Sequence, residues 1–290
     1  MFIGCDLISS DIYIVNGMSQ VHRIYDIGMT QFPSENMPGT CTIVIPTYNE
    51  EKNIQNMAKA IRAEYPDYRI LFMDDRSTDK SRELIEELND PLTKIFVREP
   101  ELRGLGASVI QGFEIAETDY AICMDCDFQH PISALKDICA KLDEGADLCV
   151  GRRNSRLSMG FKRAFGSEAV EVFCKFFFKL HGKQTTKDMM SGLFGLRCDV
   201  FRPMIQNNWG NFEIEGWKVL MDFMKYSDRK VKVGYVRYDF GTRAEGESHI
   251  NPKVIIRTFH QLWGFGKFLA KLFSKLYHID YYSMYSAEKK

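Results

Sequence analysis

The sequence lacks the features that would point to a membrane span, a secretion signal or nucleic-acid binding. No apolar run reaches the ~20 residues that a membrane-spanning helix needs, and the start of the chain has neither the basic segment nor the long apolar core of a signal peptide. A formal net charge of −1 gives no reason to expect nucleic acid as a partner. The eight cysteines are scattered along the chain, and only Cys123 and Cys126 stand at C-x-x-C spacing. We therefore expect free thiols in a reducing compartment.

A glycine-rich dinucleotide fingerprint is also missing. The first predicted strand, at 42–45, is followed by Pro46-Thr47-Tyr48-Asn49-Glu50 rather than by G-x-G-x-x-G. This argues against a dinucleotide-binding oxidoreductase, the other α/β class that the sequence could suggest. The chain has 290 residues, 45% of them apolar, and neither repeats nor low-complexity tracts, which is enough for one sizeable core.

What the sequence does contain is an alternation of apolar strand-like runs and helical segments. This pattern predicts an α/β fold with a mostly parallel sheet flanked by helices. Every polar cluster follows the carboxyl end of a predicted strand, where open α/β sheets bind their ligands. Strands are predicted at 42–45, 69–73, 94–97, 120–124 and 147–150, and helices from an N-cap at Asn49 to about 64, then at about 80–88, 105–116 and 133–142.

An acid pair, Asp125 and Asp127, stands directly after the predicted strand at 120–124. Side chains at i and i+2 of an extended chain point the same way, so the two carboxylates can converge on one point. In isolation, such a pair is more often two solvated residues of a turn. At the end of a buried strand, however, the oxygens are placed to hold a hard cation that carries substrate phosphates.

Six blocks along the chain resemble, in their order, the inverting family 2 glycosyltransferases of the GT-A fold. Within that family they are most similar to the polyprenyl-phosphate hexosyltransferases, the group that contains dolichyl-phosphate mannose synthase. The resemblance covers roughly residues 41–250, leaving 1–40 as an extension of unknown role and 251–290 as a C-terminal amphipathic helix and tail. The blocks are Ile45-Pro46-Thr47-Tyr48-Asn49-Glu50, Asp74-Asp75-Arg76-Ser77-Thr78-Asp79, Gly104-Leu105-Gly106, Asp125 through Pro131, Asp188-Met189-Met190-Ser191-Gly192 and Arg243-Ala244-Glu245-Gly246-Glu247-Ser248-His249.

The resemblance implies metal-dependent, inverting transfer of a hexose from GDP-mannose or UDP-glucose to a polyprenyl or dolichyl monophosphate. It makes Asp127 the strongest ligand for Mg²⁺ or Mn²⁺, with Gln129 as a second oxygen donor and Asp125 contacting the metal or the sugar nucleotide. A metal there can neutralise the charge that develops on the β-phosphate of the donor. The positions that frame the base and ribose in this family are matched by Pro46, Tyr48, Glu50 and Asp75.

Two of these blocks allow a second interpretation. Of Asp74 and Asp75, one could serve only as an N-cap and helix-dipole partner. Gly104 and Gly106 could let the backbone approach the donor closely, or could simply form a strand-to-helix turn.

The acceptor side is expected to be basic rather than to carry a strong general base. A lipid monophosphate is already largely ionised near neutral pH, because its second pKa is ~6. It needs a cradle that aligns its oxygen with the anomeric carbon and offsets repulsion between phosphates, for which arginine is suited. The resemblance places Arg153, Arg163, Arg243 and His249 in that cradle and Ser248 among the ligand-binding residues, although a solvated turn is the alternative for Arg153.

Three positions depart from the family pattern. Arg76 replaces the usual glycine of Asp-Asp-Gly-Ser, and arginine disfavours a positive φ. His249 replaces the usual lysine of the last block, so phosphate affinity is expected to depend on pH. The segment Tyr235-Val236-Arg237 stands where Glu-Val-Pro is more usual.

Two segments are predicted to lie at a membrane interface. Residues 161–181 combine phenylalanines with lysines, and in the resembled family this region is a helix near the lipid acceptor. In residues 252–277, Lys267, Lys271 and Lys275 recur at i+4 beside a Phe/Leu face. We therefore expect a peripheral protein on the cytoplasmic face of a membrane, bound to the lipid surface or to a small membrane subunit. Packing of these faces into the core is the alternative.

The sequence also allows two other functions. A family 2 enzyme acting on a saccharide hydroxyl, as in cell-surface polysaccharide synthesis, would need an acceptor-side base, and Asp188 or Glu215 would be the residues to suspect. A catalytically inactive nucleotide-binding subunit is supported only by the departures at Arg76 and His249.

Overall fold

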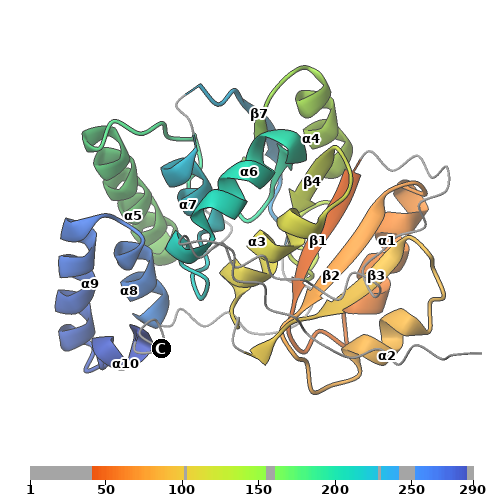
Figure 1. Cartoon of the computed structure of the whole chain (residues 1–290), viewed down its shortest axis with the longest axis horizontal. Helices are drawn as coiled ribbons and strands as arrows, with labels where there is room; N and C mark the ends of the chain where they lie inside the picture. The colour runs from red at the N-terminus through yellow and green to blue at the C-terminus, as the bar shows by residue number, and fades with distance from the viewer. Residues whose placement is uncertain (1–40, 101–102, 155–160, 228–229, 242–251, 286–290) are drawn as a thin grey trace, which may run out of the picture.

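The computed structural model describes residues 41–100, 103–154, 161–227, 230–241 and 252–285. Its centre is a seven-stranded sheet with the order β3-β2-β1-β4-β6-β5-β7 (Figure 1). Neighbouring strands are parallel except that β6 runs antiparallel to both β4 and β5. The predicted mostly parallel α/β sheet is therefore confirmed. The strands are β1 (Cys41–Thr47), β2 (Arg69–Asp74), β3 (Thr93–Val97), β4 (Tyr120–Cys123), β5 (Leu148–Arg153), β6 (Phe194–Arg197) and β7 (Val233–Tyr238).

The helices between the strands lie where the sequence predicts them, with ends shifted by a few residues. The extension at 1–40 and the proposed boundary at 250 lie outside the described residues. The helices are α1 (Ile54–Glu64), α2 (Ser81–Glu86), α3 (Leu105–Ile115), α4 (Ala134–Asp143), α5 (Phe161–Leu180), α6 (Cys198–Asn208), α7 (Val219–Tyr226), α8 (Pro252–His260), α9 (Gly264–Leu276) and α10 (Tyr281–Tyr285), with a 3₁₀ turn η4 (Trp209–Asn211).

Side chains of β1 alternate between two apolar layers, as expected for a strand buried on both faces. Ile43 and Ile45 belong to the cluster that includes residues of α1 and α4. Val44 belongs to the cluster that includes residues of α3 and of α5 to α9. Helices therefore cover both faces of the sheet, and its carboxyl edge is left to the loops.

The start of the first helix corrects one prediction. Asn49 does not cap it, since α1 begins at Ile54 and Asn53 occupies the N-cap position. Asn49 instead adopts a left-handed conformation (φ 54°), which asparagine tolerates better than most residues. Its side-chain Oδ1 accepts a hydrogen bond from the backbone N–H of Thr78 at 2.8 Å. Asn49 thus joins the loop after β1 to the loop after β2.

The cysteines and the helix lengths agree with the expectations from composition. The seven described cysteines are all buried and none forms a disulfide. Within the described ranges, no helix combines the length and apolar character needed to cross a bilayer.

The C-terminal segment forms three short helices rather than one. Figure 1 shows α8, α9 and α10 grouped with α5 at one end of the molecule. Ile256, Leu262 and Ala270 are fully buried in the main apolar cluster, so these helices pack against the core of the fold. On α5, Phe177 and Phe178 are buried too, so for these two side chains the alternative of core packing is the one that the structure shows.

A polar cluster is buried where α7 meets α8. Oδ2 of Asp222 accepts hydrogen bonds from the backbone N–H of Glu213 at 2.9 Å and from Nε2 of Gln261 at 3.1 Å. Nδ1 of His260 lies 2.7 Å from Oε2 of Glu213. Burial raises the pKa of Asp222 to about 7, although these two hydrogen bonds act in the opposite direction. The folded protein therefore binds this proton more tightly than the unfolded chain.

The substitution Asp222→Asn should remove a pH dependence of stability. Between pH ~4 and ~7 the unfolded chain is ionised at Asp222 while the folded protein is not, so the free energy of unfolding falls as pH rises, by up to ~1.4 kcal/mol per pH unit. Asparagine does not titrate, so the free energy of unfolding of the variant, relative to that of wild type, should increase from pH 5 to pH 8. Urea unfolding at the two pH values measures this.

Asp199→Asn is the matched control. The hydrogen bond from Arg197 lowers the pKa of Asp199, so this variant should gain nothing as pH rises. An equal difference between Asp222→Asn and wild type at pH 5 and pH 8 would contradict the prediction.

Candidate active site

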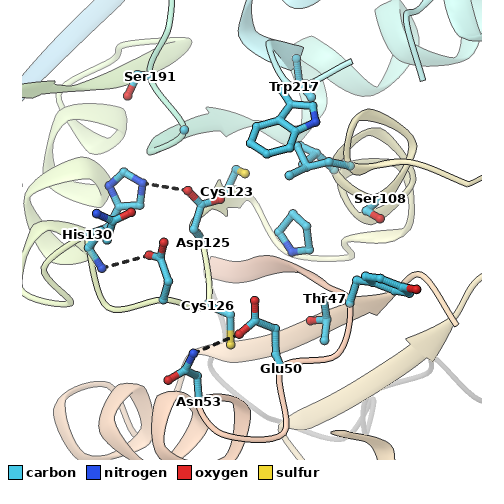
Figure 2. Close-up of a pocket in the computed structure, with 18 of the residues that line it drawn as sticks. Thr47, Glu50, Asn53, Ser108, Cys123, Asp125, Cys126, His130, Ser191 and Trp217 are labelled. Carbon is cyan, nitrogen blue, oxygen red and sulfur yellow. Dashed lines mark hydrogen bonds and ion pairs between the residues drawn. The ribbon is translucent and has the colours of Figure 1, made fainter. Parts of the chain in front are cut away.

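A cavity of about 620 Å³ opens at the carboxyl edge of the sheet, within the usual size range of small-ligand sites. It is lined by the loops after β1, β2 and β4, by the end of β5, by α3, by the residue Phe240 after β7 and by the segments that precede β6 and α7 (Figure 2). Because β6 is antiparallel, the segment before it reaches the same edge as the segments after its neighbours. Eight residues predicted from the sequence line this cavity: Pro46, Tyr48, Glu50, Asp75, Asp125, Asp127, Gln129 and Arg153.

The other predicted site residues cannot be placed. Arg243, Ser248 and His249 lie outside the described residues. Arg163 belongs to the first turn of α5, but its side chain is outside what the structure describes.

The two acids of the D-x-D block lie in a turn rather than on an extended strand. β4 ends at Cys123, and Phe128 adopts a positive φ of 60°, so the chain bends sharply after the acids. Oδ1 of Asp127 accepts the backbone N–H of Gln129 at 3.0 Å. The turn brings both carboxylates and the Gln129 amide to one cavity wall, although not by the strand alternation that the sequence suggested.

This wall suits a hard cation by its chemistry. The donors on it, from Asp125, Asp127 and Gln129, are all oxygens of carboxylate or amide groups, as Mg²⁺ and Mn²⁺ prefer. No group of three or more His, Cys, Asp or Glu side chains that could hold a metal is present in the described part of the chain. A cation here would therefore take its remaining ligands from substrate phosphates and water.

Asp74 and Asp75 have separate structural surroundings. Asp74 is fully buried and its carboxylate accepts both the backbone N–H and the hydroxyl of Ser77, so it closes the turn. Asp75 lines the cavity. Its Oδ1 accepts from the guanidinium of Arg98 at 3.0 Å, and its Oδ2 accepts from the backbone N–H of Gly104 at 3.1 Å.

Arg98 is a fully buried cation at the end of β3. Besides Asp75, its guanidinium donates to Oε1 of Gln111 at 3.0 Å, to the hydroxyl of Ser108 at 2.8 Å and to the carbonyl of Gly104 at 3.1 Å. A buried charge is tolerated only when it is paired and hydrogen-bonded. These bonds therefore fix the carboxylate of Asp75 in the cavity wall.

Arg76 keeps the turn geometry for which the family uses glycine. It has a φ of 66° and is exposed. The left-handed conformation costs a non-glycine residue roughly 1–2 kcal/mol. The loop closed by Asp74 and Ser77 imposes this conformation, so the departure at Arg76 does not alter the path of the chain.

Arg153 supplies a positive charge at the cavity. It ends β5, and its side chain is only 10% exposed. Its Nε lies 3.8 Å from Oδ2 of Asp188, and its guanidinium carbon lies 4.9 Å from the centroid of the Phe240 ring. The solvated turn that the sequence allowed for Arg153 is thus not what the structure shows.

The residues suspected as acceptor-side bases are both engaged elsewhere. Asp188 is 2% exposed and accepts the backbone N–H of Met190 at 3.0 Å, besides its contact with Arg153. Glu215 forms an ion pair with Arg257 of α8. Neither residue lines the cavity.

Three cavity residues were missed by the analysis of the sequence. Trp217 is 53% exposed, Lys218 donates from Nζ to the carbonyl of Met190 at 3.2 Å, and His130 contacts Asp125 (Figure 2). Trp217 and Lys218 precede α7, and only the antiparallel β6 and the long connection after it bring them to this edge. Nothing in their local sequence indicates this.

Gly104 and Gly106 have a role beyond the two that were predicted for them. They let α3 lie against the backbone of the segment that carries Trp217. A Cβ on Gly106 would lie 2.6 Å from the carbonyl oxygen of Glu213, and one on Gly104 would lie 2.5 Å from that of Ile214. The backbone N–H of Ala107 donates to the Ile214 carbonyl at 2.8 Å. The glycines thus position one wall of the cavity.

A class of protein follows from this arrangement. A mostly parallel sheet that carries paired carboxylates after β4 and an arginine at the end of β5 around one cavity is the architecture of a GT-A glycosyltransferase. The chain belongs to glycosyl transferase family 2, whose sequence profile matches residues 42–204.

Its relatives by sequence include proteins named dolichol-phosphate mannosyltransferase. The chain is 29% identical over 231 residues to "Dolichol-phosphate mannosyltransferase" of Pyrococcus furiosus, covering 77% of this chain and 62% of the relative. It thus spans less than two thirds of that protein. It is also 29% identical over 240 residues to the protein of the same name from Saccharomyces cerevisiae, covering 76% of this chain and 85% of the relative.

A solved structure with the same fold is glucosyl-3-phosphoglycerate synthase from Mycobacterium tuberculosis, in complex with Mn²⁺, uridine diphosphate and glucosyl-3-phosphoglycerate. It superposes with a TM-score of 0.53 at 16% sequence identity, covering 78% of this chain and 80% of that one. At this identity the likeness shows the fold alone.

The substitution Gly106→Ala should destabilise the protein by about 1–3 kcal/mol, because backbone atoms cannot move aside as a flexible side chain can. Chemical unfolding measures the change. Gly210→Ala is the matched control, since a Cβ there meets nothing within 4 Å. Equal stability of the two variants would show that α3 and the segment 213–216 are not held at the described distance.

Proposed function

We propose that this glycosyltransferase moves a hexose from a nucleotide diphosphate sugar to a polyprenyl or dolichyl monophosphate, with inversion at the anomeric carbon. GDP-mannose and UDP-glucose are the two candidate donors. The names of the relatives support the lipid acceptor, since both are dolichol-phosphate mannosyltransferases.

The observation that carries this proposal is that two cations, Arg153 and Lys218, line the cavity. The two residues suspected as bases form ion pairs or hydrogen bonds with other residues instead. Both cations line the cavity, whereas Asp188 and Glu215 do not. An acceptor hydroxyl would need a base to take its proton. An ionised phosphate needs cations to hold it, so the geometry favours the lipid phosphate over the saccharide hydroxyl. Arg163, Arg243, Ser248 and His249 would complete this cradle.

The reaction needs positioning and charge neutralisation rather than proton transfer. An oxygen of the lipid phosphate attacks the anomeric carbon as the bond from that carbon to the β-phosphate oxygen breaks, and the nucleoside diphosphate departs with the electron pair. Asp75, Glu50, Tyr48 and Pro46 would hold the base and ribose. Glu50 is oriented for this by the amide of Asn53, which donates to its Oε2 at 3.0 Å.

Asp125, Asp127 and Gln129 would hold Mg²⁺ or Mn²⁺. When bound, such a cation offsets the negative charge that builds up on the departing diphosphate.

The substitution Asp127→Asn should reduce sugar transfer roughly 100-fold or more, the scale on which electrostatic stabilisation of a transition state is lost. Asparagine keeps the shape of the side chain and can still accept the Gln129 N–H, but it removes the charge. The measurement is transfer of radiolabel into the organic phase from GDP-mannose and from UDP-glucose, each offered with dolichyl phosphate and Mn²⁺ or Mg²⁺.

The alternatives give different results in this assay. Transfer to a free saccharide but not to dolichyl phosphate would contradict the lipid acceptor. Donor binding without any transfer would favour the inactive nucleotide-binding subunit or show that a membrane subunit is required. Asp199→Asn, on the surface far along the sequence from the acid pair, should transfer sugar like wild type.

We further propose that the protein lies on the cytoplasmic face of a membrane through α5 and α9. Exposed apolar side chains remain on both helices: Val172, Phe176 and Leu180 on α5, and Phe265, Phe268, Leu272 and Leu276 on α9. The two helices meet where the rings of Phe177 and Phe265 stack at 5.3 Å. The exposed Lys267, Lys271 and Lys275 suit the anionic lipids of a cytoplasmic leaflet.

The double substitution of Phe176 and Phe268 by serine should weaken binding to vesicles that contain anionic lipid by about tenfold or more, because two large apolar groups no longer leave water. Co-sedimentation with such vesicles measures this. Val200→Ser removes an exposed apolar side chain from α6 and should bind like wild type. Wild-type protein that fails to bind vesicles, but co-purifies with a small membrane protein, would replace the lipid surface with that subunit.

A further inference from the structure

His130 lies beside the acid pair, and the proposed chemistry gives it no role. The residue is 3% exposed, and its Nε2 lies 3.3 Å from Oδ2 of Asp125 (Figure 2). Because a carboxylate only accepts hydrogen bonds, Nε2 carries the proton of this contact. The contact therefore joins a buried ring to a carboxylate whose side chain is 42% exposed.

The ring of His130 is held in place by aromatic neighbours from the end of β7. Its centroid lies 5.4 Å from that of Tyr238 and 5.4 Å from that of Phe240, at interplanar angles of 60° and 74°. Burial raises the pKa of Tyr238, so that neighbour stays neutral. Nδ1 of His130 is buried with no hydrogen-bond partner among the described residues. Packing thus sets where the ring lies, and its Nε2 faces Asp125.

Gly192 leaves the space in which this pair forms. A Cβ at that position would lie 3.2 Å from Oδ2 of Asp125 and 3.4 Å from Nε2 of His130. The first distance is tighter than ordinary contacts of a Cβ, and the second is at their lower limit. At Gly192 the segment before β6 therefore approaches the Asp125–His130 pair with backbone alone.

We propose that His130 is a positioning residue, whose Nε2–H bond fixes the orientation of the Asp125 carboxylate toward the metal–nucleotide complex. This rests on the proposed function, which places Asp125 against that complex. The terminal torsion of an aspartate is broad, so without the bond the carboxylate would be ordered only on binding, at a cost in affinity. Groups that orient metal-site ligands in this way are typically worth ~10–100-fold in affinity.

The test is binding of Mn²⁺ to the intact protein, followed by the loss of the free-ion signal in electron paramagnetic resonance, with GDP or UDP present. His130→Phe keeps the aromatic packing and removes the donor. His130→Gln returns an N–H near the position of Nε2. We expect His130→Phe to weaken Mn²⁺ binding at least ~10-fold, and His130→Gln to recover most of that loss. Thermal unfolding should show His130→Phe to be no less stable than wild type, since it loses a buried nitrogen without a partner.

Two controls separate the possible failures. Asp127→Asn should abolish binding; if it binds like wild type, the metal site of the proposed function is wrong and His130 has no ligand to position. If Asp127→Asn abolishes binding and His130→Phe matches wild type, only the positioning role is overturned. Equal losses in His130→Phe and His130→Gln, with lowered unfolding temperatures, would also overturn it in favour of a structural role. His181→Phe makes the same exchange where a histidine stacks on Trp263 at 4.0 Å and should leave Mn²⁺ binding unchanged.

Discussion

The buried guanidinium of Arg98 is the constraint on which the nucleotide side of the cavity depends. A cation that is removed from water must find acceptors for its charge, or the fold loses several kcal/mol. Arg98 finds them in Asp75, Gln111, Ser108 and the carbonyl of Gly104, which come from two separate parts of the chain. Satisfying one charge thus aligns the loop after β2 with the start of α3. The hydrogen bonds that compensate the buried charge therefore also shape one wall of the cavity.

The cavity also separates charge between its parts. Acids line the cavity from the loops after β1, β2 and β4, and, apart from Lys52 near Glu50, the lining cations stand at the end of β5 and before α7. Two anions must meet in the proposed reaction, a donor diphosphate and an acceptor phosphate, and their repulsion opposes the encounter. Cations on one side and a metal-binding wall on the other lower that repulsion while each anion keeps its own place. Preorganised charges of this kind need no rearrangement as the reaction proceeds.

Five of the seven described strands, the helices between them and much of the cavity follow from the sequence, because each polar cluster comes directly after an apolar run. The strands β6 and β7 were not predicted. What could not be predicted depends on contacts between distant segments. The sequence does not show which of Asp74 and Asp75 lines the cavity, because that depends on where Arg98 lies in the fold. It places Phe176 and Phe177 on the same helix, but only contact with α9 shows that Phe177 is covered while Phe176 stays exposed. Trp217 and Lys218 reach the cavity because β6 runs antiparallel to its neighbours and a long connection follows it. No local sequence pattern predicts this arrangement.

The path of the chain around α5 has a mechanical consequence. The chain leaves the cavity edge after Arg153 and is back at that edge by Asp188, so α5 lies on one closed excursion. The excursion is fastened at its base, where the hydroxyl of Ser191 donates to the carbonyl of Gly151 at 2.7 Å and Arg153 approaches Asp188. These contacts tie the two ends of the excursion together beside Arg153, which lines the cavity, while Phe178 of α5 is buried in the main apolar cluster. In the proposed function, a membrane surface under α5 and a phosphate in the cavity would therefore be linked through Arg153 and its neighbours.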